Sequence, residues 1–201
     1  MNKKSAALAA MTVLGGLAAL PAVAQADEAK VPGVNTGHFY AGAGVNLYFI
    51  DKGDAAEGLP VEFVDQPSPG AFMGRVGYAF NDLFAIEAQA GIGGAKQDFK
   101  DDAGVFHGEV GVTNPLAADV VLTIPVGHNG GTYLLGKAGY TSFTIERSLN
   151  GVDAPDIDVS GAEFGVGAGV RNGAWDLRGE YSFVSGDASS GVLDISILRT
   201  F

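Results

Sequence analysis

The sequence predicts an all-β fold: an eight-stranded antiparallel transmembrane up-and-down β-barrel preceded by a cleaved signal peptide. Three observations predict it. The first 26 residues have the composition of a secretory leader. Eight later segments alternate apolar residues with small or polar ones. The connections between these segments are alternately short and long, which is typical of barrels that cross outer membranes.

Residues 1–26 favour a signal peptide over a membrane-spanning helix. Lys3 and Lys4 precede an apolar run over residues 6–23, which glycines and a proline interrupt. A small-x-small site for signal peptidase follows, so we expect cleavage between Ala26 and Asp27. The expected parts of the chain are a signal peptide at 1–26, a short periplasmic N-terminal segment at 27–38 and the β-barrel at 39–201.

Charge and composition exclude several classes of protein. The full chain has a formal net charge of −11, and loss of the two leader lysines makes it −13. Such an acidic protein is not expected to bind nucleic acid, because neutralising phosphates requires Lys and Arg. The chain contains no cysteine, so no disulfide is available to it. Its 31 glycines and mean hydropathy of +0.19 are unusual for a soluble acidic domain.

The first four segments share a period of two. Residues 39–49 set Phe, Ala, Val and Leu against Tyr, Gly and Asn. Residues 72–80 set Phe, Val and Tyr against Met, Arg and Gly, and residues 84–92 set Phe, Ile and Ala against Glu, Gln and Gly. Residues 118–126 set Ala, Val, Leu and Ile against Asp, Val and Thr. Such alternation predicts strands with one apolar face.

The last four segments repeat the pattern. Residues 134–141 are less regular, with Leu, Ala and Tyr against Leu, Lys and Thr. Residues 162–171 are the clearest, with Ala, Phe and Val against Glu, Gly and Arg. Residues 175–183 set Trp, Leu, Tyr and Phe against Asp, Arg, Glu and Ser. Residues 193–201 set Leu, Ile and Phe against Asp, Ser and Thr, with Arg199 on the apolar face.

The connections predict which ends of the strands lie together. Short ones are expected around Asn81-Asp82, at 127–131 and at Asn172-Gly173. The last predicts a tight hairpin with positive φ at both turn residues, which would pair Arg171 with Ala174. In outer-membrane barrels the short turns face the periplasm and the long connections face outward. The long connections are expected at roughly 50–69, 94–115, 144–160 and 184–190.

The polar face is expected to point into the barrel. An eight-stranded barrel has an interior only just wide enough for side chains, which suits glycines opposite long charged residues. The hairpin above would set Gly169 against Asp176, and a three-residue turn at 81–83 would place Arg75 diagonal to Glu87. A secreted soluble β-sandwich or lipocalin-like barrel, with its apolar face inside, is the alternative. The expected lumenal charge network consists of Arg75, Glu87, Asp119, Lys137, Glu163, Arg171, Asp176, Arg178, Glu180 and Asp194.

Aromatic residues gather at the expected strand ends, as in two interfacial girdles. The periplasmic rim would hold Phe39, Phe80, Phe84, Trp175 and Phe201, and the outer rim would hold Phe49, Phe72, Phe164 and Phe183.

Residues 39–201 resemble the small eight-stranded outer-membrane β-barrel family, which includes the OmpA transmembrane domain, OmpX/Ail-like proteins and opacity-type surface proteins. The resemblance is carried by FYAGAG at 39–44, GRVGYAFND at 74–82, KAGY at 137–140 and the terminal Phe201. It implies the outer membrane of a Gram-negative bacterium, with outer-membrane lipid, lipopolysaccharide and the barrel-assembly machinery as partners. Phe201 looks like the family's barrel-assembly signal. Because the sequence ends at the eighth segment, no peptidoglycan-binding domain is expected.

Other candidate sites are weaker. Asp98, Asp101 and Asp102 in one long connection, and Asp153, Asp156 and Asp158 in another, supply the oxygen ligands that Ca²⁺ and Mg²⁺ prefer. No spacing matches a calcium loop, so neither a metal nor a cofactor is expected. The only histidines are His38, His107 and His128, and none is placed to activate a nucleophile, so no catalytic residue is expected.

Three functions remain open at this stage. The leading one is a non-enzymatic, monomeric surface barrel that contributes to envelope integrity and presents its loops outward. The lumenal charges would then form a static network, since buried charges are costly when unpaired. The alternatives are a narrow porin-like channel for ions or small solutes, and an adhesin or immune-evasion protein. Bilayer conductance separates the first two, and the adhesin hypothesis requires that loop-swapped cells lose host-surface binding.

Overall fold

The computed structural model describes residues 37–51, 68–100, 107–126, 131–186 and 190–201. The predicted signal peptide, its cleavage site at Ala26 and Asp27, and nearly all of segment 27–38 lie outside these residues. Within them, no helix is long and apolar enough to cross a membrane. The strands are β1 (His38–Ile50), β2 (Gly70–Ala79), β3 (Phe84–Gly93), β4 (Gln97–Lys100), β5 (His107–Val126), β6 (Thr132–Leu149), β7 (Val152–Asn172), β8 (Trp175–Gly186) and β9 (Ser190–Thr200).

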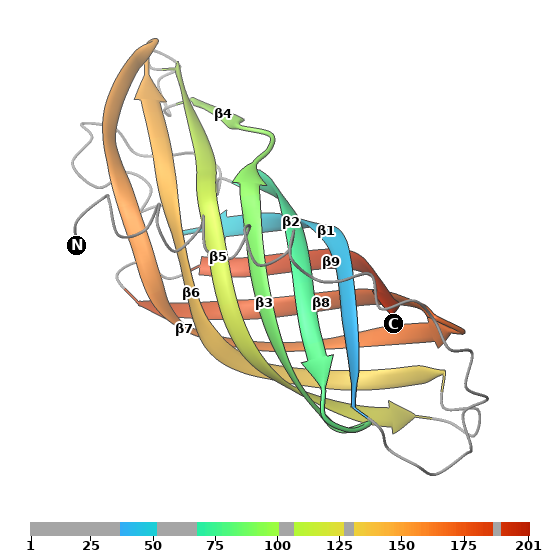
Figure 1. The fold of residues 1–201 in the computed structure, drawn as a ribbon. Helices are drawn as coiled ribbons and strands as arrows, with labels where there is room; N and C mark the ends of the chain where they lie inside the picture. The colour runs from blue at the N-terminus through green and yellow to red at the C-terminus, as the bar shows by residue number, and fades with distance from the viewer. Residues whose placement is uncertain (1–36, 52–67, 101–106, 127–130, 187–189) are drawn as a thin grey trace.

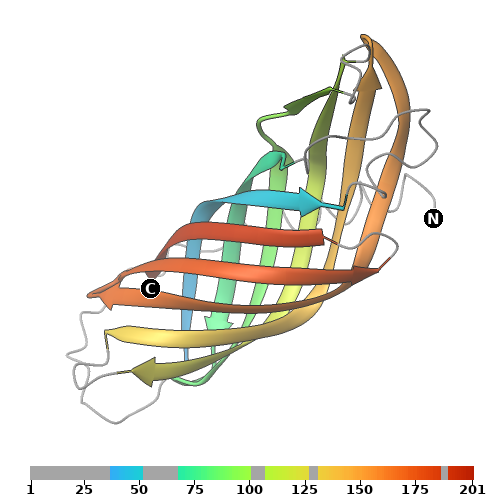
Figure 2. The ribbon, with the colours of Figure 1, turned by 180° about the vertical axis from the view of Figure 1, so that it is seen from behind.

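Eight of these strands form a closed antiparallel ring, in the order β1-β2-β3-β5-β6-β7-β8-β9 (Figures 1 and 2). The ring closes where β1 pairs with β9, from Tyr40 opposite Thr200 to Ile50 opposite Ser190. The short strand β4 lies outside the ring and pairs only with the beginning of β5. The predicted eight-stranded up-and-down barrel is therefore confirmed.

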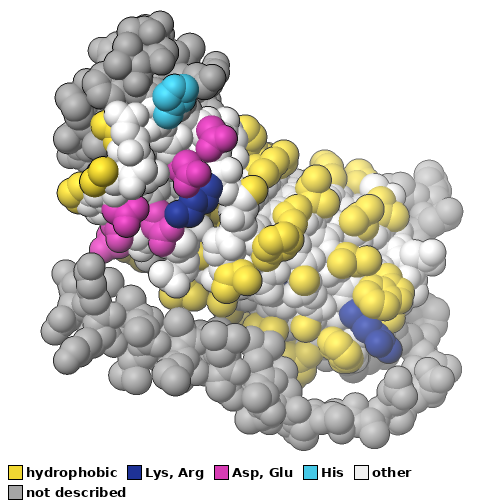
Figure 3. Space-filling model, turned by 90° about the horizontal axis from the view of Figure 1, so that it is seen from above, with side chains coloured by type: hydrophobic (Ala, Val, Ile, Leu, Met, Phe, Trp, Pro, Cys, Tyr) yellow, Lys and Arg dark blue, Asp and Glu magenta, His cyan; other side chains and the backbone are white. Residues whose placement is uncertain are grey.

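The apolar face of each ring strand points outward, as predicted. Val45, Leu47, Ile195 and Ile197 are exposed on β1 and β9, whereas Asn46 and Ser196 between them are buried. Figure 3 shows apolar side chains spread over the barrel wall. The soluble alternative, with its apolar face inside, is wrong. Of the expected girdle residues, Phe49 alone is half-buried, and the exposed ones are Phe39, Phe72, Phe80, Phe84, Phe164, Trp175, Phe183 and Phe201.

Two connections predicted as long loops are partly strands. The expected loop at 94–115 contains β4 and the first part of β5, and the expected loop at 144–160 contains the ends of β6 and β7. A two-residue turn joins β6 to β7, with φ of 51° at Asn150 and 76° at Gly151. Positive φ at both positions is the type I′ geometry that Asn-Gly favours. The Asn150-Gly151 dipeptide was therefore the sequence signal for a hairpin here. Acidic residues and a proline over 153–158 obscured it.

The long strands β5, β6 and β7 project beyond the rest of the barrel as a curved sheet (Figure 1). β7 pairs with β8 only from Gly161 onward, so, among the described residues, 152–160 pair with β6 alone. Pro155 lies along this edge, where the register with β6 shifts between Ile145 and Arg147. A proline, charges and an irregular register are devices that prevent edge strands from pairing with other chains.

A β-bulge in β5 explains why its first half was missed. The register with β6 shifts between Thr113 and Leu116, and Asn114 has a φ of 51°. Before the bulge the even-numbered Val110 and Val112 are buried, and after it the odd-numbered Asp119 and Val121 are. The inserted residue reverses the alternation, so no single period of two runs through the strand.

The β7–β8 hairpin forms with a register that differs by two residues from the predicted one. The turn residues are Gly173 and Ala174, and Asn172 pairs with Trp175. Only Gly173 has positive φ, at 61°, as in a type II′ turn, where glycine takes the first central position. Arg171 therefore lies opposite Asp176, and Gly169 lies opposite Arg178 rather than Asp176. A slip of two residues keeps every side chain on its face but changes every partner.

The barrel interior has three layers. At the short-turn end, where the chain enters at His38, lie Tyr40, Ala79, Ala85, Val121, Tyr133, Leu135 and Leu198. The middle layer is charged. At the opposite end lies an apolar plug, made of Tyr48, Ile50, Ala71, Met73, Val110, Val112, Phe143, Ile145, Val159, Val184 and Val192.

The seam between β1 and β9 predicts a position that tolerates only glycine. A Cβ on Gly42 would lie 2.1 Å from the backbone oxygen of Ile197, whereas a Cβ on Gly179 would meet nothing within 4 Å. We expect Gly42→Ala to destabilise the barrel by about 1–3 kcal/mol through overpacking, and Gly179→Ala to change little. Urea titration, read by the difference in migration between cold and boiled samples, checks this. Equal midpoints for the two variants would contradict it.

Candidate functional site

The charged middle layer is the candidate functional site. All ten predicted lumenal charges lie on inward faces of the strands, and nine of them are buried. The exception is Arg171, whose side chain is 35% exposed at the short-turn end. The layer joins positions that are far apart in sequence, because each strand of a ring contributes one or two inward side chains at a given height.

Glu180 of β8 lies at the centre of the layer. Its Oε1 accepts hydrogen bonds from Arg75 and from Arg178, the latter at 3.4 Å from Nη1. Its Oε2 lies 3.3 Å from Nζ of Lys137. These bases come from β2, β8 and β6, so one carboxylate connects three walls of the barrel.

Glu87 of β3 is a second bridging carboxylate. Its Oε2 lies 3.2 Å from Nη1 of Arg75, and Arg178 donates to its Oε1. The hydroxyl of Tyr40 also donates to that oxygen, at 2.6 Å. The register sets Gly77 opposite Glu87 and Gln89 opposite Arg75, so Arg75 is diagonal to Glu87 as the three-residue turn predicts. Arg75 and Arg178 thus share both Glu87 and Glu180.

Two further pairs extend the network. Nζ of Lys137 lies 2.6 Å from Oε1 of Glu163, on the neighbouring strand β7. Nη2 of Arg75 lies 2.9 Å from Oδ1 of Asp194, which also accepts from the Ser196 hydroxyl at 2.9 Å. Charge-assisted hydrogen bonds of this kind satisfy buried ions that would otherwise be costly.

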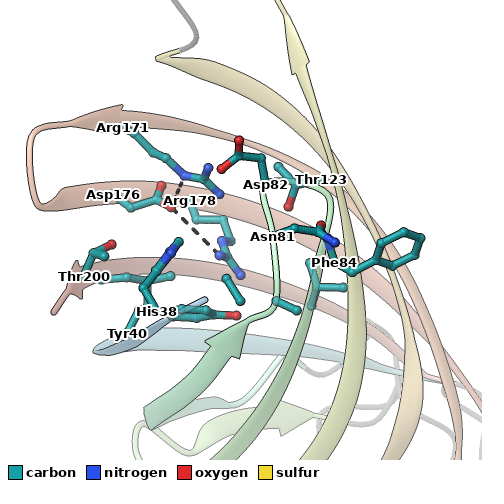
Figure 4. A pocket seen from close by; sticks show the side chains of 14 residues that line it. His38, Tyr40, Asn81, Asp82, Phe84, Thr123, Arg171, Asp176, Arg178 and Thr200 are labelled. Atoms are coloured by element: carbon teal, nitrogen blue, oxygen red, sulfur yellow. Dashed lines mark hydrogen bonds and ion pairs between the residues drawn. The ribbon is translucent and has the colours of Figure 1, made fainter. Parts of the chain in front are cut away.

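The short-turn mouth of the lumen holds a smaller ion pair (Figure 4). Nε of Arg171 lies 3.3 Å from Oδ2 of Asp176, and the guanidinium of Arg171 lies 4.4 Å from the centre of the Tyr133 ring. The Tyr133 hydroxyl donates to Asp176 at 2.7 Å and accepts from Nε of Arg178 at 3.1 Å. A cavity of about 20 Å³ opens beside these residues, with room for about one water molecule.

Asp119 is a buried acid of this layer that lacks a basic partner among the described residues. Its Oδ2 accepts a hydrogen bond from Gln89 at 3.0 Å, and its Oδ1 has no hydrogen-bond partner among the described residues. None of the ion pairs in the described part of the chain includes Asp119. Oδ2 of Asp194 is also without a hydrogen bond there. With six acids and four bases, the network has an excess of negative charge.

Sequence reasoning missed the uncharged members of the network. Tyr40, Tyr133, Gln89 and Ser196 all donate to its carboxylates. Gln89, Tyr133 and Ser196 each lie on the same face of the strand as a predicted charge, whereas Tyr40 lies on the polar face of β1, which carries no charge. The inward period was the signal that could have found all four. Which carboxylate each one meets depends on the register.

The other candidate sites do not come together among the described residues. No three acidic, histidine or cysteine side chains there are placed to hold a metal ion. Asp98, Asp153, Asp156 and Asp158 are exposed in β4 and β7, whereas Asp101 and Asp102 lie outside the described residues, as does His128. His38 lies at the short-turn end and His107 at the opposite end.

Comparison with known proteins identifies the fold. The family model described as outer membrane protein beta-barrel domain matches residues 11–195. The structure of Ail, the attachment invasion locus protein of Yersinia pestis, in complex with the heparin analogue sucrose octasulfate, has a TM-score of 0.54 at 13% identity, covering 83% of this chain and 99% of that one. The structure of OprG of Pseudomonas aeruginosa has a TM-score of 0.53 at 13% identity, and the match covers 86% of this chain and 99% of OprG. The N-terminal β-barrel domain of Pseudomonas aeruginosa OprF has a TM-score of 0.52 at 14% identity, and the match covers 83% of this chain and 98% of that domain. The search of curated proteins found no match.

The charge imbalance predicts opposite effects for two lumenal substitutions. Arg75→Gln removes a base that three carboxylates share, so we expect a loss of about 3–5 kcal/mol in unfolding free energy. Asp119→Asn removes an unpaired carboxylate at similar burial while keeping the acceptor for Gln89, so we expect no loss or a gain. Lys96→Gln, which breaks only an exposed pair with Glu146, should cost at most about 1 kcal/mol.

Equilibrium urea unfolding of the three variants in the same detergent measures these differences. If Arg75→Gln and Asp119→Asn lower stability equally, the packing of the lumen rather than its charge balance determines the effect.

Proposed function

This chain belongs to the outer membrane protein beta-barrel domain family, and from that premise we propose that it is a closed, non-enzymatic barrel that contributes to envelope integrity and presents a rigid sheet at the cell surface. Its location is the outer membrane of a Gram-negative bacterium. The observation that carries the proposal is a lumen filled with buried side chains, since a barrel without a continuous water path would serve as an anchor rather than a pore.

Two of the three layers of the lumen support closure. The apolar plug contains Tyr48, Phe143 and Ile145, all almost fully buried, and an ion would have to lose its hydration shell to pass among them. Below the plug, Arg75 and Arg178 are each held by two or more carboxylates, so a passing ion would have to break several charge-assisted bonds.

The projecting sheet supports a role at the surface. Its outward side chains include Glu109, Glu146 and Asp153, and Figure 3 shows acidic side chains gathered there. The Ail structure contains a sulfated ligand, sucrose octasulfate. The acidic sheet here would repel such a polyanion, so we propose no heparin-like ligand for this chain.

The absence of enzymatic activity is part of the proposal. A hydrolytic site needs a nucleophile, a base and an orienting acid within hydrogen-bond reach of one another. The described histidines, His38 and His107, lie at opposite ends of the barrel. The buried Ser182 and Ser196 lie in the lumen, where substrate has no access.

Bilayer recording tests closure against the channel alternative, which the unpaired oxygens of Asp119 and Asp194 favour, since a cation pathway needs a negative lining. We expect the folded chain to give no discrete openings in a planar bilayer in which a large porin conducts. Openings that disappear in Glu87→Gln or Arg178→Gln would overturn the proposal and establish a channel gated by this network.

We also propose that export removes residues 1–26 and that Phe201 acts as the barrel-assembly signal. Phe201 is exposed, and its N–H donates to the backbone oxygen of Phe39 on β1 at 2.9 Å, next to the closing seam. Protein extracted from the outer membrane should therefore have the intact mass of residues 27–201, and Phe201→Ala should reduce its amount there. A mass that includes the leader would contradict the cleavage site.

A further inference from the structure

The barrel wall carries one exceptional side chain. Arg199 of β9 is exposed on the outward face, on the same face as Ile195 and Ile197, which precede it along the strand. Among the described residues of the eight ring strands it is the only base on an outward face; the other lysines and arginines there point inward. A cation on a wall that contacts lipid is costly unless its charge reaches the interface or meets an anion.

Two aromatic rings hold this guanidinium in place. Trp175 on β8 lies directly opposite Arg199 in the register, and its ring centre is 5.7 Å from Cζ of Arg199. The ring centre of Phe201 is 5.6 Å from the same atom. Both distances are within the range of cation–π attraction, which restrains the guanidinium without neutralising its charge.

Among the described residues, Arg199 has no acidic partner for its charge. None of the ion pairs in the described part of the chain includes it. Among the residues whose side chains the structure describes, the exposed Lys96 is paired with Glu146, and the partly exposed Arg171 is paired with Asp176. The five donors of Arg199 are therefore available to a ligand, and its planar fork matches the oxygens of a phosphate.

The position of Arg199 indicates which phosphate it meets. It lies at the short-turn end, within the girdle that Phe39, Trp175 and Phe201 form. Aromatic girdles mark the height of lipid headgroups, and short turns face the periplasm in this class of barrel. We propose that Arg199, held between Trp175 and Phe201, binds the phosphate of a phospholipid headgroup in the periplasmic leaflet. The proposal rests on the membrane placement of the barrel and does not depend on whether the lumen conducts.

The chain contains its own reporter for this site. Trp175 is the only tryptophan, so its fluorescence reports on the environment of the Arg199 guanidinium alone. The experiment titrates the folded chain, in an uncharged maltoside detergent, with dihexanoylphosphatidylglycerol. A saturable change in Trp175 emission is expected. Arg199→Gln should raise the half-saturation concentration about tenfold, because the charge-assisted bonds to the phosphate are lost.

Three controls make the result decisive. Lys96→Gln removes the same charge at the opposite end and should leave the half-saturation unchanged, whereas Arg199→Lys should lie between wild type and Arg199→Gln. Inorganic phosphate and dihexanoylglycerol, which lack the lipid tails and the phosphate respectively, should not reproduce the response. The proposal would be overturned if Arg199→Gln and wild type had equal half-saturation concentrations, or if Lys96→Gln weakened binding as much as Arg199→Gln. The same response to either control ligand would also overturn it. A barrel that still shifts on boiling shows that such a failure concerns this site and not the fold.

Discussion

The pairing of the first strand with the last is the constraint on which the rest of the structure depends. In the lipid core no water is available for backbone N–H and C=O groups, so a sheet can cross only if it has no free edge. β1 and β9 remove that edge by pairing over eleven positions, from Tyr40 to Ile50. The close approach of Gly42 to the Ile197 carbonyl shows how tightly this seam is packed. Outside the ring, the projecting part of β7 leaves an edge, and there proline and irregular register replace pairing.

Closure with only eight strands makes the interior narrow, and this width explains the lumen. Every inward position must either carry a large side chain or make room for one. Tyr40 and Tyr133 fill the space over Gly77 and Gly169, where a Cβ would lie 2.2 Å from the tyrosine ring or hydroxyl. The same narrowness brings charges from β2, β3, β6 and β8 within hydrogen-bond distance of one another. Burial of so many charges is tolerable because Arg75 and Arg178 are shared between carboxylates rather than paired singly.

The inward and outward faces of the barrel differ in their chemistry. The outward face is apolar where it meets lipid and acidic on the sheet that projects beyond the barrel. Arg199 departs from this division at the short-turn rim, with aromatic rings on either side. The charges inside pair mainly with one another, whereas the outward charges lie at the two ends of the barrel. Under the proposed function, the lumenal network keeps the barrel closed and any binding takes place at these ends.

The sequence by itself determined the number of ring strands, the face that meets lipid and the ten charges that point inward, because a period of two sorts side chains without reference to any partner strand. Only the tertiary structure decided which charges meet. The two-residue slip at Gly173-Ala174 left every side chain on its face and still replaced Asp176 by Arg178 opposite Gly169. Only pairing with β6 showed that residues 152–160 are strand, since acids and Pro155 there are typical of a loop. Likewise, nothing local distinguishes Asp119 from Glu180. One lacks a base and the other has three because the ring brings distant strands together, and that arrangement is not encoded in any one segment.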